Sequence, residues 1–172
     1  MVRRATNADA EAIARVWILS WQQAYAHAFP PEVFAALTVE ERTRHALEMI
    51  RSRGWGVFVS DGDEDLAGYA AVGPSEELDG CGELYAIYVD AAHWGSGVAQ
   101  ALLERSEDEL RARGFGDAVL RVLADNPRAR RFYERNGWVA GESLRVPIRG
   151  HEVDVVRYRK DLSARVTSGP ES

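Results

Sequence analysis

The chain has 172 residues, 46% of them hydrophobic and 28% charged, which is typical of one globular domain that buries its own core. A single cysteine, Cys81, excludes an internal disulfide framework, and no apolar run approaches the roughly 20 residues of a membrane helix. The formal net charge of −6 argues against a nucleic-acid binder. The polar N-terminus lacks the apolar stretch of a signal peptide, so we expect a soluble, cytoplasmic protein.

Lysine and histidine are both scarce, which narrows the possible chemistry. Lys160 is the only lysine, so the sequence has no GxxxxGK phosphate-binding loop, and a Schiff-base mechanism is not favoured. The four histidines lie far apart, without HxxxH or HExxH spacing. We therefore expect no metal site.

The first half of the chain predicts helices followed by an antiparallel meander. Asn7 or Asp9 can cap the first long helix, while Thr38 and Glu41 form a capping box for a later one that Gly54 ends. The predicted elements are a strand over 2–5, a helix that stops before Pro30, helices over 31–37 and 38–53, and strands over 55–60, 66–73 and 83–89.

The second half predicts a β-α-β-α-β unit. Its first helix is strongly amphipathic, with its leucines on one side and Gly114 placed as the C-cap. Asn126 and Pro127 are typical N-cap and first-position residues for the second helix. The predicted elements are helices over 98–113 and 127–136 and strands over 118–123, 138–141 and 151–159. We expect one α/β (α+β) domain over residues 1–162 and a disordered tail over 163–172.

The most informative motif is the loop between the strand over 83–89 and the helix that follows. Successive small residues over 95–99 let the backbone approach a ligand, and the first amides of a helix have no internal partners, so this loop is suited to phosphates. The alternative is a tight turn that needs glycine for its geometry alone. A dinucleotide fingerprint fits poorly, because the third glycine is missing and the loop follows more than half of the chain.

A second motif, NPRARRFYERNGW, gives the first one a context. The two together resemble the GCN5-related N-acetyltransferase (GNAT) superfamily, and the element order fits over residues 2–160. Members of the family carry a Q/R-x-x-G-x-G/A loop after their fourth strand, which corresponds here to residues 94–99. They also carry an asparagine after the fifth strand and a FYE-x-x-GF pattern, represented here by Asn126 and residues 132–138. Trp94 departs from the pattern, which prefers Gln or Arg, but the loop binds through main-chain amides.

The resemblance implies a GNAT-type domain whose mixed, mostly antiparallel sheet is flanked by helices and has splayed strands at an acyl-CoA cleft. Acetyl-CoA would lie between the strands 83–89 and 118–123, with its pyrophosphate on the loop amides. Asn126 would bond the cofactor, cap its helix, or do both. Arg130 is one of four clustered arginines that would either bind phosphates or form a solvated face. The implied cofactor-binding residues are Ile87, Tyr88, Val89, Gly95, Ser96, Gly97, Val98, Ala99, Asn126 and Arg130.

The resemblance also implies catalytic residues. Tyr133 would be the general acid that protonates the departing thiolate, and its alternative role is a packed aromatic side chain. Glu83 is our candidate general base for the acceptor amine, with an edge-strand glutamate as the alternative and His93 as a second candidate. The ribosomal-protein alanine acetyltransferases of this family place a glutamate where this chain has Arg121, which argues against that activity.

The acceptor pocket is expected on the first helices. Trp17, Trp21 and Tyr25 recur at helical spacing, a pattern more often found in a core than in a site. Acceptor contacts are therefore expected from Tyr25, Phe29 and Tyr85 rather than from Trp17.

We expect an acetyltransferase that moves an acetyl group from acetyl-CoA to a primary amine by direct attack in a ternary complex. No activated nucleophile is evident, since Cys81 has no flanking base. The alternative is a non-catalytic GNAT-fold module that binds acyl-CoA as a sensor or interaction subunit, and retention of Tyr133 and Glu83 argues against it. The expected acceptor is a small-molecule or peptide amine. We expect no nucleic-acid or membrane partner, and the resemblance allows a homodimer.

Overall fold

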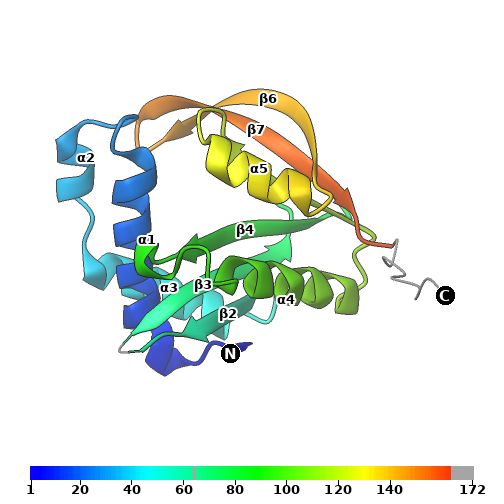
Figure 1. Ribbon diagram of the computed structural model, residues 1–172, viewed down its shortest axis with the longest axis horizontal. Helices are drawn as coiled ribbons and strands as arrows, with labels where there is room; N and C mark the ends of the chain where they lie inside the picture. Colours follow the sequence, from blue (N-terminus) through cyan, green and yellow to red (C-terminus); the bar gives the residue numbers. More distant parts are fainter. Residues whose placement is uncertain (64, 164–172) are drawn as a thin grey trace.

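A computed structural model describes residues 1–63 and 65–163, in which a seven-stranded sheet carries helices on both faces (Figure 1). The elements in chain order are β1 (Val2–Arg4), η1 (Asn7–Asp9), α1 (Ala10–Tyr25), α2 (Pro31–Ala35), α3 (Val39–Arg51), β2 (Gly56–Asp61), β3 (Leu66–Pro74), β4 (Gly82–Val89), η2 (Ala91–His93), α4 (Val98–Ala112), β5 (Asp117–Leu123), α5 (Pro127–Arg135), β6 (Val139–Ile148) and β7 (His151–Asp161). None of the described helices is long and apolar enough to cross a membrane. Apart from Ser163, the tail expected over 163–172 lies outside the described residues.

The strand order is β1-β2-β3-β4-β5-β7-β6. Neighbouring strands are antiparallel except β4 and β5, which are parallel and joined by the crossover helix α4. The predicted meander and the mixed, mostly antiparallel sheet are therefore confirmed. Among the described strands, the one parallel pair is thus the pair that the crossover through α4 connects.

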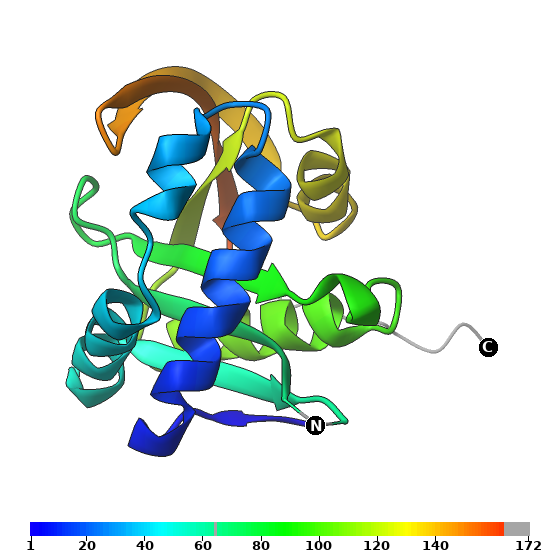
Figure 2. The same ribbon diagram turned by 90° about the vertical axis from the view of Figure 1, so that its left-hand side faces the viewer.

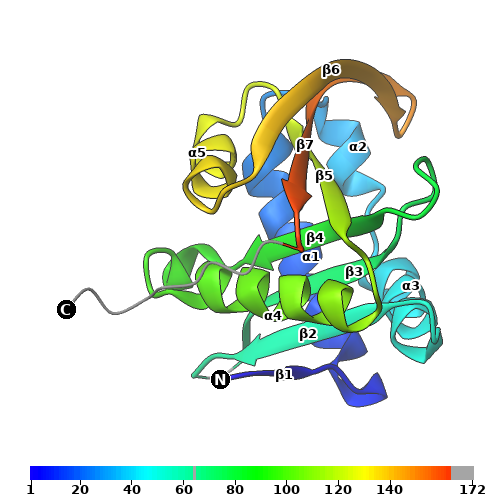
Figure 3. The same cartoon turned by 90° about the vertical axis from the view of Figure 1, so that its right-hand side faces the viewer.

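Each face of the sheet has its own hydrophobic core. On one face, α1 and α3 pack over β2, β3 and β4, and the stripe on α1 buries Ile13, Trp17 and Trp21 (Figure 2). On the other face, α4 buries Leu102, Leu103 and Leu110, and α5 lies beside α4 over the second half of the sheet (Figure 3). The leucine spacing on α4 thus predicted the buried side correctly.

A bulge in β4 divides this strand between the two cores. Leu84 is opposite Val72, whereas Ala86 is opposite Ala71, so Tyr85 is an extra residue. Leu84 packs into the α4 core, but Ala86 and Tyr88 pack against the α1 core. The bulge thus changes which face each later side chain of β4 occupies, close to where β4 leaves β5.

The helix termini follow the predicted caps with small differences. Thr38 Oγ1 accepts a hydrogen bond from the Glu41 amide at 3.2 Å, and Gly114 has the positive φ of 89° expected after a helix. The prediction that Asn7 or Asp9 caps the first helix with its side chain is wrong. Thr6 is the N-cap of a 3₁₀ turn over Asn7–Asp9 that precedes α1, and the Asp9 carboxylate accepts from the Thr6 amide at 2.7 Å instead of capping α1.

The strand expected over 138–141 is much longer, since β6 continues to Ile148. It is an edge strand whose residues are mostly exposed, and its pairing shifts register between Ala140 and Ser143. Such a strand lacks the clean alternation of apolar and polar residues that predicts strands from sequence.

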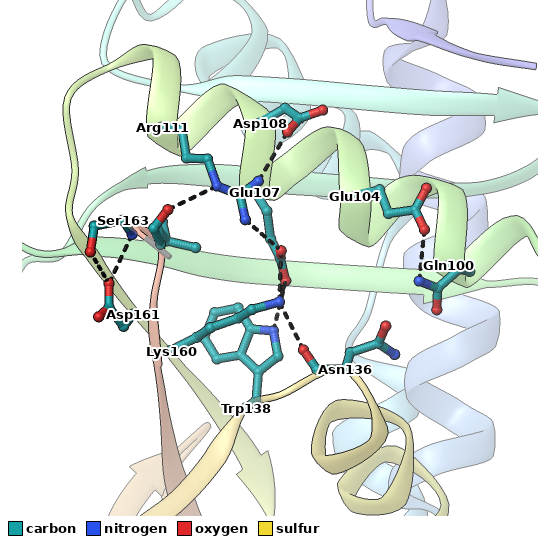
Figure 4. Close-up of polar contacts among 11 residues, drawn as sticks. Gln100, Glu104, Glu107, Asp108, Arg111, Asn136, Trp138, Lys160, Asp161 and Ser163 are labelled. Atoms are coloured by element: carbon teal, nitrogen blue, oxygen red, sulfur yellow. Dashed lines mark hydrogen bonds and ion pairs between the residues drawn. The ribbon is translucent and has the colours of Figure 1, made fainter. Parts of the chain in front are cut away.

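A buried ion pair joins the two halves of the sheet on the α4 face (Figure 4). Lys160 Nζ on β7 donates to both carboxylate oxygens of Glu107 on α4, at 2.7 and 2.8 Å. The Trp138 indole also donates to Glu107, at 3.0 Å, and Lys160 donates to the Asn136 carbonyl at 2.7 Å. The lone lysine of the chain thus holds the end of α5 against α4 and β7.

Candidate active site

A cleft of about 570 Å³ opens where β4 and β5 separate. The two strands pair only at Gly82 with Ala118 and at Glu83 with Val119. Beyond these pairs the facing edges diverge, which leaves backbone N–H and C=O groups available for a ligand. The cleft is lined by residues from α1, the end of β4, the loop before α4, and α5.

The glycine loop forms one wall of this cleft. Gly95 and Gly97 have φ values of 77° and 88°, a conformation that favours glycine, and both line the cleft together with Ala99. Gly97 is the N-cap of α4 and has no side chain that could accept a hydrogen bond. The first amides of this 15-residue helix therefore have no capping side chain as an acceptor. Ser96, in the same loop, and Val98, the first residue of α4, do not line the cleft. The wall is suited to an anionic group.

The backbone of β4 forms the floor of the cleft. Ile87, Tyr88 and Val89 all line it, as expected for a strand edge that faces an extended ligand. The Val89 carbonyl accepts a hydrogen bond from the Trp94 indole at 3.0 Å. Trp94, the departure from the family pattern, therefore folds back onto the strand that it follows.

Trp94 also reaches across the mouth of the cleft to α5. The Arg128 guanidinium lies 3.5 Å from the centre of the Trp94 ring, a close cation–π contact. Burial lowers the pKa of Arg128, and both side chains line the cleft. Sequence reasoning did not single out this pair, because the two residues are 34 positions apart and only the fold brings them together.

α5 provides the wall opposite the glycine loop. Asn126 Oδ1 accepts from the Ala129 amide at 3.1 Å, so the predicted N-cap is confirmed, and Asn126 also lines the cleft. Tyr133 lines the cleft with only 9% of its surface exposed. Burial, with a smaller contribution from Tyr88, raises the pKa of Tyr133. The raised pKa keeps the hydroxyl protonated. In the described part of the chain nothing is hydrogen-bonded to this hydroxyl, so it is available to a ligand.

Arg130 lies outside the cleft lining. Its guanidinium donates to the Tyr158 hydroxyl at 3.0 Å and to the Ala124 carbonyl at 3.1 Å. The arginines of α5 that do line the cleft are Arg128 and Arg135. A short amphipathic helix with four arginines does not reveal from its sequence which of them faces the ligand.

Glu83 lies at the start of β4, where β4 still pairs with β5, and is outside the cleft lining. It is 5% exposed, and its Oε2 accepts from the Ser75 hydroxyl at 2.8 Å. Arg121 Nη2 is 3.8 Å from Glu83 Oε1. Burial raises the pKa of Glu83 above that of an ordinary glutamate, against the lowering effects of Ser75 and Arg121.

The expected acceptor residues fall into two groups. Tyr25 and Phe29 belong to an aromatic cluster with Trp21, at centroid distances of 4.4 Å for Trp21–Tyr25 and 5.3 Å for Trp21–Phe29. Tyr85, the bulge residue, packs against Trp55 with the ring centroids 4.5 Å apart and donates to the Pro74 carbonyl at 2.7 Å. None of the three lines the cleft.

One face of α1 completes the cleft, and sequence reasoning missed it. Ser20, Gln23, Ala24 and His27 line the cleft and follow one another at helical spacing. His27, in the turn after α1, has its Nε2 2.7 Å from Asp125, which joins this turn to the segment after β5. The signal was present as a small polar face beside the aromatic stripe, but the sequence analysis considered only the stripe.

Comparison with known proteins identifies a family model and several relatives that resemble this chain. The family model described as "Acetyltransferase (GNAT) family" matches residues 13–138. The chain is 32% identical over 130 residues to the uncharacterized N-acetyltransferase YuaI of Bacillus subtilis, covering 73% of each chain. It is 29% identical over 140 residues to the L-methionine sulfoximine/L-methionine sulfone acetyltransferase of Salmonella typhimurium, covering 80% of this chain and 78% of that protein.

Solved structures share the fold. The PaiA N-acetyltransferase of Thermoplasma acidophilum, crystallised with coenzyme A, has a TM-score of 0.75 and 20% identity over 94% of this chain and 98% of that one. The chain also matches mycothiol acetyltransferases, but it spans only 19% to 40% of their length. These comparisons agree with the family resemblance of the sequence and with the observed fold.

Proposed function

Because the chain belongs to the acetyltransferase (GNAT) family, we propose that it moves an acetyl group from acetyl-CoA directly to a primary amine within a ternary complex. Family membership makes it an acetyl-CoA-dependent N-acetyltransferase, and the direct route and the amine acceptor are the finer proposal. The observation that carries this proposal is that the glycine loop and Tyr133, which are far apart in sequence, line one cleft. The Salmonella relative is named for small amino-acid analogues, which supports a small amine as the acceptor.

The cleft residues fit acetyl-CoA. Gly95 and Gly97 have no atom within 4 Å of the position a Cβ would take, so the loop is open above its backbone. The uncapped start of α4 is suited to the pyrophosphate, and the edge of β4 at Ile87–Val89 is suited to the amide groups of the pantetheine arm. Arg128 adds a positive charge at the same opening.

Burial tunes the two residues that we propose as general base and general acid, Glu83 and Tyr133. When bound, acetyl-CoA supplies an acetyl group activated as a thioester. Glu83 takes the proton of the acceptor amine as the new C–N bond forms, directly or through water. Tyr133 holds its proton at neutral pH and gives it to the sulfur as the C–S bond breaks. The raised pKa of Glu83 also makes it a stronger base than an exposed carboxylate.

A covalent acetyl-enzyme route has little support. Cys81 is 6% exposed, lies on the loop before β4 and does not line the cleft. Burial raises the pKa of its thiol, which lowers the fraction of the reactive thiolate. Direct attack by the amine needs no enzyme nucleophile and is consistent with this environment.

The proposal is tested by acetyl-CoA consumption with a panel of amines, small molecules and peptides included. We expect turnover with at least one amine, one thiol released for each N-acetylated product, and no acetyl-enzyme trapped in the absence of acceptor. A protein that binds CoA but consumes no acetyl-CoA with any amine would instead be the non-catalytic binding module.

A further inference from the structure

Two arginines lie side by side on the face of the sheet that carries α1. Arg121 on β5 and Arg157 on β7 are direct register partners, so their side chains leave the sheet together. The Arg157 side chain is only 16% exposed and the Arg121 side chain 36%. Like charges placed directly opposite on neighbouring strands repel one another, so carboxylates must stabilise the pair. Glu142 Oε2 on β6 lies 3.1 Å from Arg157 Nη1, and a further anion fits between the two guanidinium groups.

A carboxylate already occupies that position. Glu77 accepts from Arg121 Nη1 through Oε1 at 3.2 Å and from Arg157 Nη2 through Oε2. Glu77 belongs to the loop that connects β3 and β4, and its side chain is 47% exposed. The occupant is therefore a half-exposed loop residue, whereas the two arginines are fixed on paired strands. The Glu77 side of this ion pair is open to solvent, so a competing carboxylate can reach the arginines and displace Glu77.

The same arginines lie next to Glu83, the proposed base. Arg121 Nη1 bonds Glu77, while Arg121 Nη2 is 3.8 Å from Glu83 Oε1. The loop that carries Glu77 is also tied to the base, because the Ser75 hydroxyl donates to Glu83 Oε2 at 2.8 Å. One guanidinium thus spans the carboxylate position and the base.

Resting on the proposed acetyl transfer, we propose that Arg121 and Arg157 bind the carboxylate of the acceptor, which displaces Glu77. In an α-amino acid one carbon separates the carboxylate from the amine. A carboxylate held between the two guanidiniums therefore brings its own amine beside Glu83. The acceptor class is consequently an α-amino acid or another short amine that carries a carboxylate, and Glu77 competes with it for the arginines.

The electrostatics of the base are consistent with such an exchange. Glu77 is one of the groups that raise the pKa of Glu83, together with the larger effect of burial. An acceptor carboxylate in the same place would keep that negative charge near the base. Substrate binding would then preserve the basicity of Glu83 rather than reduce it.

Matched acceptors test the assignment. Wild-type kcat/KM is measured for amino acids and for their α-amides, which keep the amine and lose the carboxylate. We expect the free acids to be preferred at least about tenfold and Arg157→Met to abolish that preference, mainly through KM. Arg159→Met is the control, since Arg159 lies two residues along β7, is exposed and pairs with Asp117 at 3.0 Å. This control should keep the preference although it removes the same charge.

Glu77→Ala provides a second test that loss of folding cannot imitate. Removing the competing carboxylate should lower KM for the free acids about fivefold and leave the amides unchanged. Amino acids added without acetyl-CoA should also raise the melting temperature of Glu77→Ala more than that of the wild type. If amides are used as well as acids by the wild type, the carboxylate site is wrong while acetyl transfer stands. If neither class is acetylated but other amines are, the acceptor class is wrong; if no amine is acetylated, the proposed function itself fails.

Discussion

At the scale of single residues, the buried hydroxyl of Tyr133 is the clearest candidate for the general acid. Tyr133→Phe keeps the ring contacts with Phe132 and Trp138 and removes only the proton donor. We expect kcat to fall by about 10²-fold, with the affinity for CoA little changed. The measurement is kcat together with the CoA-induced rise in melting temperature, and a folded variant with wild-type kcat would make Tyr133 a packing residue.

Glu83 makes a prediction about pH. An exposed glutamate has a pKa of about 4.3, and burial raises the pKa of Glu83 above this. As the pH falls, Glu83 is therefore protonated, and lost as a base, at a higher pH than an exposed glutamate would be. kcat/KM should therefore rise with pH along a limb set by Glu83 or by the amine. Glu83→Gln should flatten or shift that limb and depress the rate near neutral pH. Its effect should shrink toward pH of about 10, where amines lose the proton unaided.

The CoA-induced thermal shift is the control for this variant, since the glycine loop is untouched and the shift should persist. A Glu83→Gln enzyme with the wild-type rate and pH profile, measured with its best acceptor, would remove Glu83 from the mechanism. His93, which lines the cleft, would then be the next candidate.

At the scale of elements, the start of α4 determines cofactor binding. Gly97→Asp places a negative side chain at the helix end that is proposed to hold the pyrophosphate, so the CoA-induced thermal shift should disappear. Gly114→Asp is a matched control at the opposite end of the same helix. Its φ of 89° is almost equal to the 88° of Gly97, so the backbone strain is similar, but Gly114 is remote from the cleft. Gly114→Asp should keep the shift, and a folded Gly97→Asp protein that also keeps it would contradict the placement.

Helices, strands and caps with local signals could be predicted from the sequence, whereas details that depend on how the strands pair could not. Asn126 and Thr38 were identifiable as caps because capping depends on residues three positions away. The bulge at Tyr85 has no local signal, since it exists only relative to the register of β3. The site shows the same division: the glycine loop is a local motif, whereas the Trp94–Arg128 contact depends on the separation of two strands.

At the scale of the whole molecule, the Glu107–Lys160 pair holds the two halves of the sheet together. Lys160→Met would leave a carboxylate that is 8% exposed, with Trp138 and Arg111 as its remaining partners among the described residues. We expect the free energy of unfolding to fall by about 2 kcal/mol, which is less than for a buried charge left without a cation, because Arg111 stays paired with Glu107. Arg44→Met removes a more exposed arginine from its pair with Glu40 and should change stability by less than about 1 kcal/mol. Urea unfolding of both variants checks this, and equal stabilities would contradict it.

The two sides of the gap between β4 and β5 are made one after the other during synthesis, because the chain crosses from one side to the other once, between α4 and β5. β1 to β4 and helices α1 to α4 precede that point, and every later element lies beyond it. On the ribosome, the glycine loop is therefore made before the residues of β5 and α5 exist. A ligand that contacts both sides can bind only after the second segment has docked, and by mass action it then holds the segment in place. In cells rich in the cosubstrate, a larger fraction of newly made chains would thus keep the second segment docked, and fewer would be open to proteolysis.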